Sequence, residues 1–177
     1  MKIKSFNKTD YISSRKSILK LLVQTAHEAG SNSAHIGGAL SSVDILTVLF
    51  KYFLGLNKIN IKKFDRNYFI LSKGHACLVY YSVLAHYGFI DFEELKTFEK
   101  DGSKLLGHPV LNTDLGIDFS TGSLGNGVGI GVGLAIGLKK MKSESNVYII
   151  VGDGECNEGS VWESIMSAPK FELDNLN

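Results

Sequence analysis

The chain has 177 residues, of which 44% are hydrophobic, and a formal net charge of +1 at pH 7. This length and composition indicate one globular domain with a sizeable core and exclude a disordered chain. The balance of 19 basic against 18 acidic residues gives no electrostatic basis for binding nucleic acid or a membrane surface.

Two further features concern cellular location. The first residues, MKIKSFNKTDYISSRK, lack the apolar segment of a secretory signal, and no apolar run is long enough to span a membrane. Cys77 and Cys156 lie far apart and outside any CxxC pair, which argues against a zinc or redox site. We therefore expect a cytoplasmic protein in a reducing compartment.

The N-terminal third of the chain predicts two helices separated by a loop. Apolar residues at helical spacing predict a helix from an N-cap at Asp10 to about Gly30. Residues 31–40, SNSAHIGGAL, have the composition of a loop. Ser41 followed by Asp44 resembles a capping box, and it predicts a second helix that runs to about Leu54.

The middle of the chain predicts a strand followed by two helices. The apolar, aromatic-rich run 67–72, NYFILS, predicts a buried strand. A helix over about 76–87 should follow, ended by Gly88. Asp91 should cap a short amphipathic helix that ends near Lys100.

The glycine-rich stretch that follows a long loop, 101–123, is locally ambiguous. Residues 126–140 alternate glycine with aliphatic residues, which favours a strand, and each glycine inside a helix costs about 1 kcal/mol relative to alanine. The length of the stretch and its LAIGLKK end nevertheless predict a helix. Its glycines would let another backbone approach closely.

The clearest strand signal is residues 146–151, NVYIIV, which a Gly-Asp-Gly turn follows. After that turn a helix should run to about Ala168, because Pro169 breaks it. Strands that alternate with helices predict an α/β fold, a parallel sheet flanked by helices. Ligands bind at the carboxyl ends of strands in such sheets, so His75 and Asp153 should lie on the same edge.

The sequence lacks the common nucleotide-binding and hydrolase motifs. Ile130 stands where a Rossmann fingerprint needs its third glycine, and neither a P-loop nor a GxSxG nucleophile elbow occurs. What remains is a strand, a glycine turn and a helix start followed by acids, VGDGECNEG. Helix starts bind anions through free N–H groups, but carboxylates repel an anion unless a metal ion lies between them.

Four segments, in order along the chain, resemble the N-terminal, diphosphate-binding domain of transketolase, a thiamine diphosphate enzyme. They are AHIGGALSSVDILTVLF, LSKGHACLVYYSVLAHYGF, GHP with TGSLGNG, and GDGECNEGSVWES. The resemblance implies the α/β fold of the diphosphate-binding (PP) domain over residues 1–177, incomplete at its C-terminal end. Deoxyxylulose phosphate synthase and 2-oxoacid dehydrogenase subunits also carry GDG, but LSKGH and TGSLGNG favour transketolase.

The resemblance implies a cofactor site. Asp153 would ligate the Mg²⁺ or Ca²⁺ that bridges the two phosphates of thiamine diphosphate, which suits a hard cation. Gly152 and Gly154 would lie beside the diphosphate, and Gly154 would offer its backbone N–H to it. His75 would donate a hydrogen bond to the same group. The residues expected along the rest of the cofactor are Gly122, Ser123 and Leu124.

The resemblance also implies catalytic and interface roles. His35 and His108 would line the substrate channel, where they would bond sugar hydroxyls and move protons. Glu158 would belong to the interface between paired active sites. We expect Glu155 to be a surface or helix-start acid. Trp162, the sole tryptophan, should anchor the core or an interface.

Part of the family's site lies outside this chain. The metal site also needs an asparagine at the end of the strand after the GDG helix; we expect no strand there, and Asn175 and Asn177 come too early. The pyrimidine-binding domain, whose glutamate activates the cofactor, is absent. The resemblance therefore implies a transketolase subunit that moves a two-carbon ketol unit between sugar phosphates only with a C-terminal partner subunit, in a homo- or hetero-oligomer. An inactive remnant or assembly module is the alternative.

Overall fold

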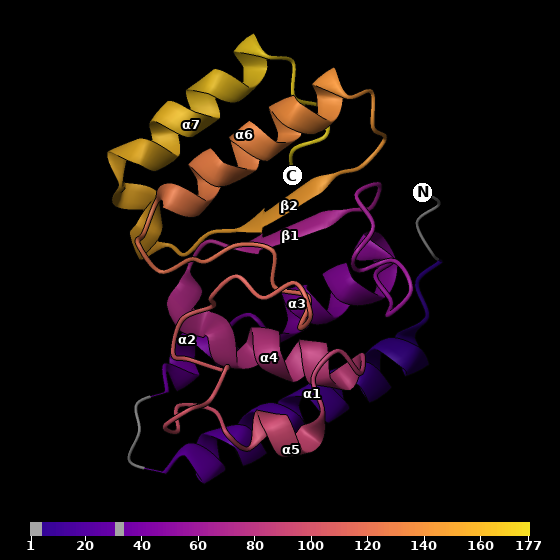
Figure 1. Cartoon of the computed structure of the whole chain (residues 1–177), viewed down its shortest axis with the longest axis vertical. Coiled ribbons are helices and arrows are strands. Elements are labelled where there is room, and N and C mark those ends of the chain that lie inside the picture. Colours follow the sequence, from indigo (N-terminus) through magenta and orange to yellow (C-terminus); the bar gives the residue numbers. More distant parts are fainter. Residues whose placement is uncertain (1–4, 31–33) are drawn as a thin grey trace.

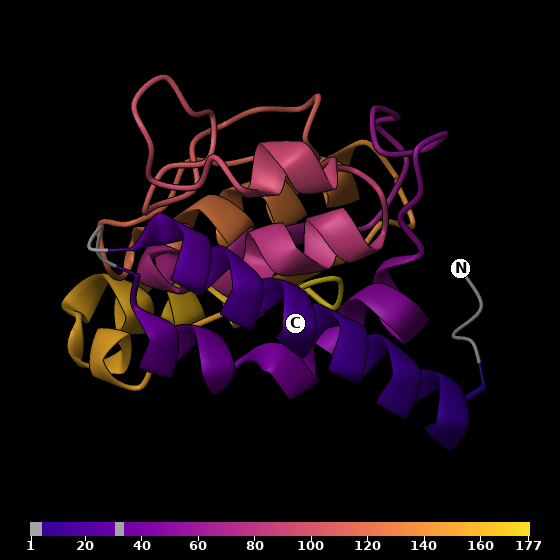
Figure 2. The ribbon, with the colours of Figure 1, turned by 90° about the horizontal axis from the view of Figure 1, so that it is seen from below.

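A short parallel sheet lies between two layers of helices (Figure 1). In this computed structural model, which describes residues 5–30 and 34–177, β1 (Tyr68–Leu71) pairs in parallel with β2 (Val147–Ile150). Two helices, α6 (Asn126–Lys140) and α7 (Gly159–Lys170), lie on one side of the sheet. On the other side lie α1 (Lys8–Ala29), α3 (Val43–Val48) and α4 (Cys77–His86). Figure 2 views this second layer from below, with α1 across its front. The α/β prediction is confirmed.

The helical elements follow one another around this sheet. In chain order they are α1 (Lys8–Ala29), α2 (Ile36–Leu40), α3 (Val43–Val48), the π-helical turn η1 (Leu49–Leu54), the 3-10 turn η2 (Gly74–Ala76), α4 (Cys77–His86), α5 (Phe92–Leu95), α6 (Asn126–Lys140), the 3-10 turn η3 (Gly154–Asn157) and α7 (Gly159–Lys170). None of these helices combines the length and the apolar character that crossing a bilayer requires, within the residues that the structure describes.

All four residues of β1 are buried, and β2 has buried ends and a half-buried middle, which explains why both sequences are continuous apolar runs. Phe69 and Leu71 pack into the cluster formed with α1, α3 and α4. Tyr68 and Ile70 point to the other side, into the cluster formed with α6. Successive side chains of a strand alternate between its two faces. A strand without polar residues therefore needs a helical layer on each face to shield its apolar side chains from water.

The last residues of the chain run parallel to β2 and form an isolated bridge to it, while no strand follows α7 in the described residues. The N–H of Val147 donates to the Asn175 carbonyl at 2.8 Å, and the N–H of Ile149 donates to the Asn177 carbonyl at 2.9 Å. These bonds place β2 between β1 and the last residues of the chain. The Asn175 side-chain amide donates to the Ala135 carbonyl at 3.1 Å, so it faces α6 rather than the carboxyl edge.

The predicted glycine-rich helix is present as α6, and two of its glycines allow close packing on the sheet. A Cβ built on Gly127 would collide with the side chain of Ser72, and one on Gly131 would collide with Ile149. Those two glycines therefore let α6 lie directly on the sheet. Gly133 and Gly137 meet nothing within 4 Å, so they contribute nothing to this close approach.

Two predicted helix starts differ in the structure because the predicted capping side chains bind other groups or because another residue caps the helix. Asn7, not Asp10, caps α1, and its side chain accepts the N–H of Asp10 at 3.1 Å. The capping box does not form: Ser41 donates to the Gly38 carbonyl, while Asp44 binds Tyr11 and Arg15.

Other boundaries also differ. The predicted loop over 31–40 contains α2 from Ile36 onward, and residues 31–33 of that prediction lie outside the described part of the chain. The helix after Asp91 is short, since α5 ends at Leu95. Pro169 lies inside the last turn of α7 rather than at its break.

Candidate functional site

The carboxyl ends of β1 and β2 meet at one edge of the sheet and carry two turns. One turn begins at Ser72 and continues into η2, and the other begins at Gly152 and continues into η3. The turns touch, since a Cβ built on Gly152 would lie 3.4 Å from the Cβ of Lys73. The expectation that His75 and Asp153 share an edge of the sheet therefore agrees with the geometry.

A third segment, the loop before α6, closes over the β1 turn. A Cβ built on Gly74 would come within 2.7 Å of the Thr121 carbonyl carbon, so only glycine permits this approach. Gly122 has a φ of +150° and lies against the ring of His108, which a Cβ would approach to 2.8 Å. Backbone contacts thus bring three distant segments together.

The structure brings His35, His75 and His108 into one neighbourhood. The rings of His35 and His75 lie 5.4 Å apart, edge to face, and Gly38 lies against the ring of His75. A pocket of about 300 Å³ opens beside them, lined by His35, Glu99, Leu106, Gly107, His108 and Val110. Two of the three predicted histidines therefore face one pocket, and the third adjoins it.

Burial lowers the pKa values of two side chains at this edge of the sheet. Partial burial lowers the pKa of His75, and the neighbouring His35, Lys73 and His108 lower it further, while Glu155 opposes them. Burial likewise lowers the pKa of Lys73, against the opposing charges of Asp153 and Glu155. A histidine and a lysine that are both harder to protonate than usual thus lie close to the acids of the GDG turn.

The segment that carries His108 is fixed to α4 by partly buried hydrogen bonds. The hydroxyl of Tyr81 donates to the carbonyls of Leu106 at 2.9 Å and His108 at 3.3 Å. The Cys77 thiol lies 3.0 Å from the Gly107 carbonyl. Burial raises the pKa of Cys77 to about 12, so this thiol stays protonated and can donate.

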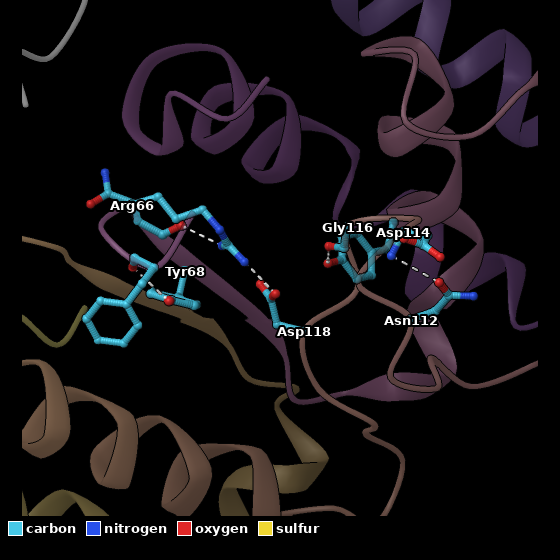
Figure 3. A network of polar contacts seen from close by, with 9 residues as sticks. Arg66, Tyr68, Asn112, Asp114, Gly116 and Asp118 are labelled. Atoms are coloured by element: carbon cyan, nitrogen blue, oxygen red, sulfur yellow. Dashed lines mark hydrogen bonds and ion pairs between the residues drawn. The ribbon is translucent and has the colours of Figure 1, made fainter. Parts of the chain in front are cut away.

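A buried ion pair fixes the other end of the same loop (Figure 3). The Arg66 guanidinium, at the start of β1, donates to the Asp118 carboxylate at 2.5 Å and lies 4.3 Å from the centre of the Tyr68 ring. The Tyr80 hydroxyl donates to the Gly116 carbonyl at 3.0 Å. Burial raises the pKa of Asp118, against the pull of Arg66. The loop is therefore held at both ends.

The residues at this edge fit an anionic ligand and leave room for it. Asp153 and Gly154 are exposed, and a Cβ on Gly154 would meet nothing within 4 Å. A cavity of about 320 Å³ adjoins the loop before α6 and is lined by Ser120, Thr121, Gly122, Ser123, Asn126, Gly127 and Ile130. The hydroxyl of Thr121 is buried there without a hydrogen-bond partner among the described residues, as expected of a group that awaits a polar ligand.

Glu155 was expected to be a surface or helix-start acid; it does lie in the first turn of η3, but it is buried, with 1% of its area exposed. Its carboxylate accepts hydrogen bonds from the Ser72 hydroxyl at 2.5 Å, from the Gly125 N–H at 2.8 Å and from the Gly152 N–H at 3.1 Å. Only the bond to Gly152 could have been predicted from the local sequence, because an acid three residues after a turn glycine can accept its N–H. The other two partners lie too far away in sequence to be predicted.

The remaining predicted residues lie around α7. Glu158 is exposed and precedes the first residue of that helix, beside Gly125. Trp162 is 56% exposed, so it does not anchor the core of this chain. Its indole N–H donates to the Cys156 carbonyl at 2.8 Å. Ser123 and Leu124 are exposed on the loop before α6.

The start of the last helix differs from the prediction. No α-helix begins directly after the GDG turn: η3 intervenes, and α7 begins at Gly159. Gly154 is therefore at the start of a 3-10 turn, whose first N–H groups are still free of helical partners.

Comparisons with known proteins agree with this geometry. Residues 14–177 match the model of the transketolase, thiamine diphosphate binding domain. The chain is 40% identical over 157 residues to an apulose-4-phosphate transketolase subunit of Actinobacillus succinogenes, covering 89% of this chain and 56% of that protein. It is 39% identical over 155 residues to human transketolase, covering 87% of this chain and 24% of that protein.

Solved structures give the same result. The transketolase of Campylobacter jejuni superposes with a TM-score of 0.86 and 32% identity, over 97% of this chain and 28% of that one. The chain thus spans about half the length of the apulose-4-phosphate transketolase subunits and about a quarter of the longer transketolases. The shared fold and the match over residues 14–177 show that the chain belongs to the family of transketolase N-terminal, thiamine diphosphate-binding domains.

Proposed function

We propose that this chain is the N-terminal part or subunit of a transketolase that moves a two-carbon ketol unit from a ketose phosphate to an aldose phosphate. The observation that carries the proposal is the gathering of His35, His75 and His108 beside the carboxyl edge that holds Asp153. Family membership implies thiamine diphosphate as the cofactor. When bound, that cofactor supplies the stabilised carbanion that ketol transfer needs.

The diphosphate would bind at the carboxyl ends of the strands. Gly152 and Gly154 would lie beside its oxygens, and Gly154 would donate its backbone N–H. The imidazole of His75 would donate a further hydrogen bond through a ring N–H, which histidine carries in either protonation state. The open space beside Gly154 supports this placement. The loop residues proposed along the rest of the cofactor are Gly122, Ser123 and Leu124.

Asp153 would hold Mg²⁺ or Ca²⁺ against the diphosphate, since hard cations prefer carboxylate and phosphate oxygens. The described residues, 5–30 and 34–177, contain no group of three or more His, Cys, Asp or Glu side chains that could hold a metal ion. We therefore propose that Asp153 supplies one ligand and that phosphate oxygens supply others. The metal would bind together with the cofactor rather than before it.

His35 and His108 would act on the substrate. Both line the pocket of about 300 Å³, and both side chains are exposed to solvent at its mouth. There they would donate hydrogen bonds to sugar hydroxyls and move protons to and from the substrate oxygen. Because the pocket adjoins His75, the substrate would lie next to the proposed cofactor site.

We also propose that residues 1–177 form one domain that works with a partner subunit carrying the pyrimidine-binding domain, in a homo- or hetero-oligomer. Relatives named as transketolase subunits support a divided enzyme. Glu158 would lie in the subunit interface, where its exposed position beside Gly125 is accessible. Cys77 and Cys156 are free thiols, which supports a cytoplasmic location.

Calorimetry on the chain with thiamine diphosphate and MgCl₂ tests the cofactor site. We expect a heat of binding that disappears when EDTA removes the metal. The alternative, an assembly module that keeps the fold without the cofactor, predicts no heat in either condition. The buried, unpartnered hydroxyl of Thr121 favours a bound polar ligand over that alternative.

A reconstitution assay tests the reaction. The chain mixed with a transketolase C-terminal subunit, thiamine diphosphate and Mg²⁺ should transfer a ketol unit from a ketose phosphate to an aldose phosphate. A deoxyxylulose phosphate synthase would instead release CO₂ from pyruvate during the condensation. CO₂ release without ketose consumption would reject the transketolase assignment.

A further inference from the structure

One buried carboxylate joins all three segments of the proposed cofactor site. The side chain of Glu155 accepts the Ser72 hydroxyl from the β1 turn, the Gly125 N–H from the loop before α6, and the Gly152 N–H from its own turn. Ser72 lies 83 residues away in sequence and Gly125 lies 30 residues away. Each bond thus connects a different segment to the same group.

The surroundings of Glu155 require all three bonds. A carboxylate that is 1% exposed is costly to bury unless donors surround it. Losing one bond would leave a buried backbone N–H unsatisfied at Gly125 or Gly152, both of which are buried. The arrangement therefore holds the three segments in one relative position.

Gly125 adds a backbone constraint. Its φ is +85°, in the left-handed region that favours glycine. A Cβ there would collide with Ser160 and would lie 2.9 Å from the Cβ of Glu158. The N–H of Gly125 can therefore point at Glu155 only while the loop keeps this conformation, which couples the loop to the start of α7.

Glu155 does not serve as a ligand itself. One carboxylate oxygen accepts two hydrogen bonds and the other accepts one, all from protein donors. Asp153, two residues earlier, is exposed. Two acids of one turn thus differ, one being exposed to solvent and the other directed to the protein interior.

We infer that Glu155 is a positioning residue: it sets the spacing of the β1 turn, the loop before α6 and the β2 turn, and thereby the affinity for thiamine diphosphate. This inference rests on the proposed function for its ligand, but its geometric part is independent of any ligand. Glu155 would thereby fix the position of residues 120–127, to which it is joined by the single hydrogen bond from the Gly125 N–H.

Hydrogen exchange on the full chain tests the geometric part. In Glu155→Ala we expect the Gly125 amide to exchange at least about tenfold faster, which corresponds to about 1.4 kcal/mol, together with the amide of Gly152. In Glu155→Gln the amide oxygen can still accept from Ser72 and Gly125, so exchange at Gly125 should return toward the parent value while Gly152 stays fast. Glu144→Gln, which removes an exposed charge, is the control and should change neither amide.

Calorimetry with thiamine diphosphate and Mg²⁺ tests the functional part. Measured well below each variant's melting temperature, the dissociation constant of Glu155→Ala should rise at least about tenfold, with Glu155→Gln and Ser72→Ala between it and the parent. A purely structural role would lower the melting temperature and leave the dissociation constant unchanged. If Glu155→Ala does not fold, the dissociation constants of Glu155→Gln and Ser72→Ala show whether this carboxylate controls the affinity for thiamine diphosphate.

The outcomes separate the two claims. Parent protein that binds no cofactor, while exchange at Gly125 still responds to Glu155, rejects the proposed function and keeps the positioning role. Parent protein that binds cofactor, with Gly125 exchange and affinity unchanged in all variants, overturns the positioning role alone. Faster exchange confined to residues 152–156 in Glu155→Ala also overturns it, because the link to the loop before α6 would then be absent.

Discussion

Gly74 and Thr121, from segments on opposite sides of α4 in sequence, touch through their backbones: a Cβ on Gly74 would lie 2.7 Å from both the carbonyl carbon and the carbonyl oxygen of Thr121. Backbone cannot yield as a flexible side chain does. This contact places the loop before α6 over the β1 turn and so forms the site.

Gly74→Ala should therefore displace that loop. Overpacking of this kind costs about 1–3 kcal/mol, and we expect urea unfolding to show such a loss along with weaker binding of thiamine diphosphate. Gly137→Ala is the matched control, because nothing lies within 4 Å of a Cβ there, and helix propensity should raise stability by up to about 1 kcal/mol. Equal stabilities of the two variants would contradict the close approach.

Asp153→Asn should separate folding from ligand binding. Asp153 is exposed, so the free energy of unfolding without ligand should change by less than about 0.5 kcal/mol. Loss of the carboxylate ligand should raise the dissociation constant for thiamine diphosphate in Mg²⁺ at least about tenfold. Asp101→Asn, another exposed acid, should leave the dissociation constant unchanged in the same calorimetric titration.

The ion pair of Arg66 and Asp118 should behave as a buried pair. Arg66→Met leaves the Asp118 carboxylate, whose side chain is 10% exposed, without its cation and should cost about 3–5 kcal/mol. Adding Asp118→Leu should restore most of that loss, because no buried charge then remains unpaired. Chemical unfolding of the single and double variants measures the loss of stability and its recovery. A double variant no more stable than Arg66→Met would show that the unpaired charge of Asp118 does not cause the loss.

Stability should fall on acidification. Burial lowers the pKa values of His75 and His86, so the folded state binds their protons less readily than the unfolded chain does. The stabilisation is therefore complete above the ordinary histidine value of about 6.5 and is lost as the pH falls through the lower folded values. Urea unfolding at pH 7.5 and 5.5 should show the loss.

His86 provides the variant for this test. It lies on α4, with Nδ1 3.0 Å from the Ser17 hydroxyl, away from the proposed catalytic residues. His86→Gln should reduce the difference in unfolding free energy between the two pH values. If the unfolding free energy of His86→Gln changes between the two pH values as much as that of the parent, groups other than His86 cause the loss of stability in acid.

Trp162 can report on partner binding. It is the sole tryptophan, it is 56% exposed, and the neighbouring Ile165 and Met166 on α7 are exposed as well. If this face is covered by the proposed partner subunit, the fluorescence maximum should shift to shorter wavelength when a transketolase C-terminal subunit is added. Complex formation by sedimentation without such a shift would place the interface elsewhere.

Local patterns predicted much of the fold. The strand residues 68–71 and 147–150 lie within the apolar runs that predicted them, because burial on both faces leaves a signature in every residue of a strand. Helix α6 also has the predicted limits. Its glycines at 127 and 131 lie four residues apart and so share one face against the sheet, which explains why the local strand-like alternation did not prevail.

The sequence by itself determined the order of strands and helices and the segments that form the site, because hydrophobic period, glycine turns and short motifs are encoded by neighbouring residues. Only the tertiary structure decided which acid after the GDG turn faces the interior. The burial of Glu155 depends on donors 83 and 30 residues away, and the parallel bridge of the last residues to β2 depends on free carbonyl and N–H groups of that strand. Contacts between distant residues leave no pattern in either local sequence, so they emerge only when the chain is folded.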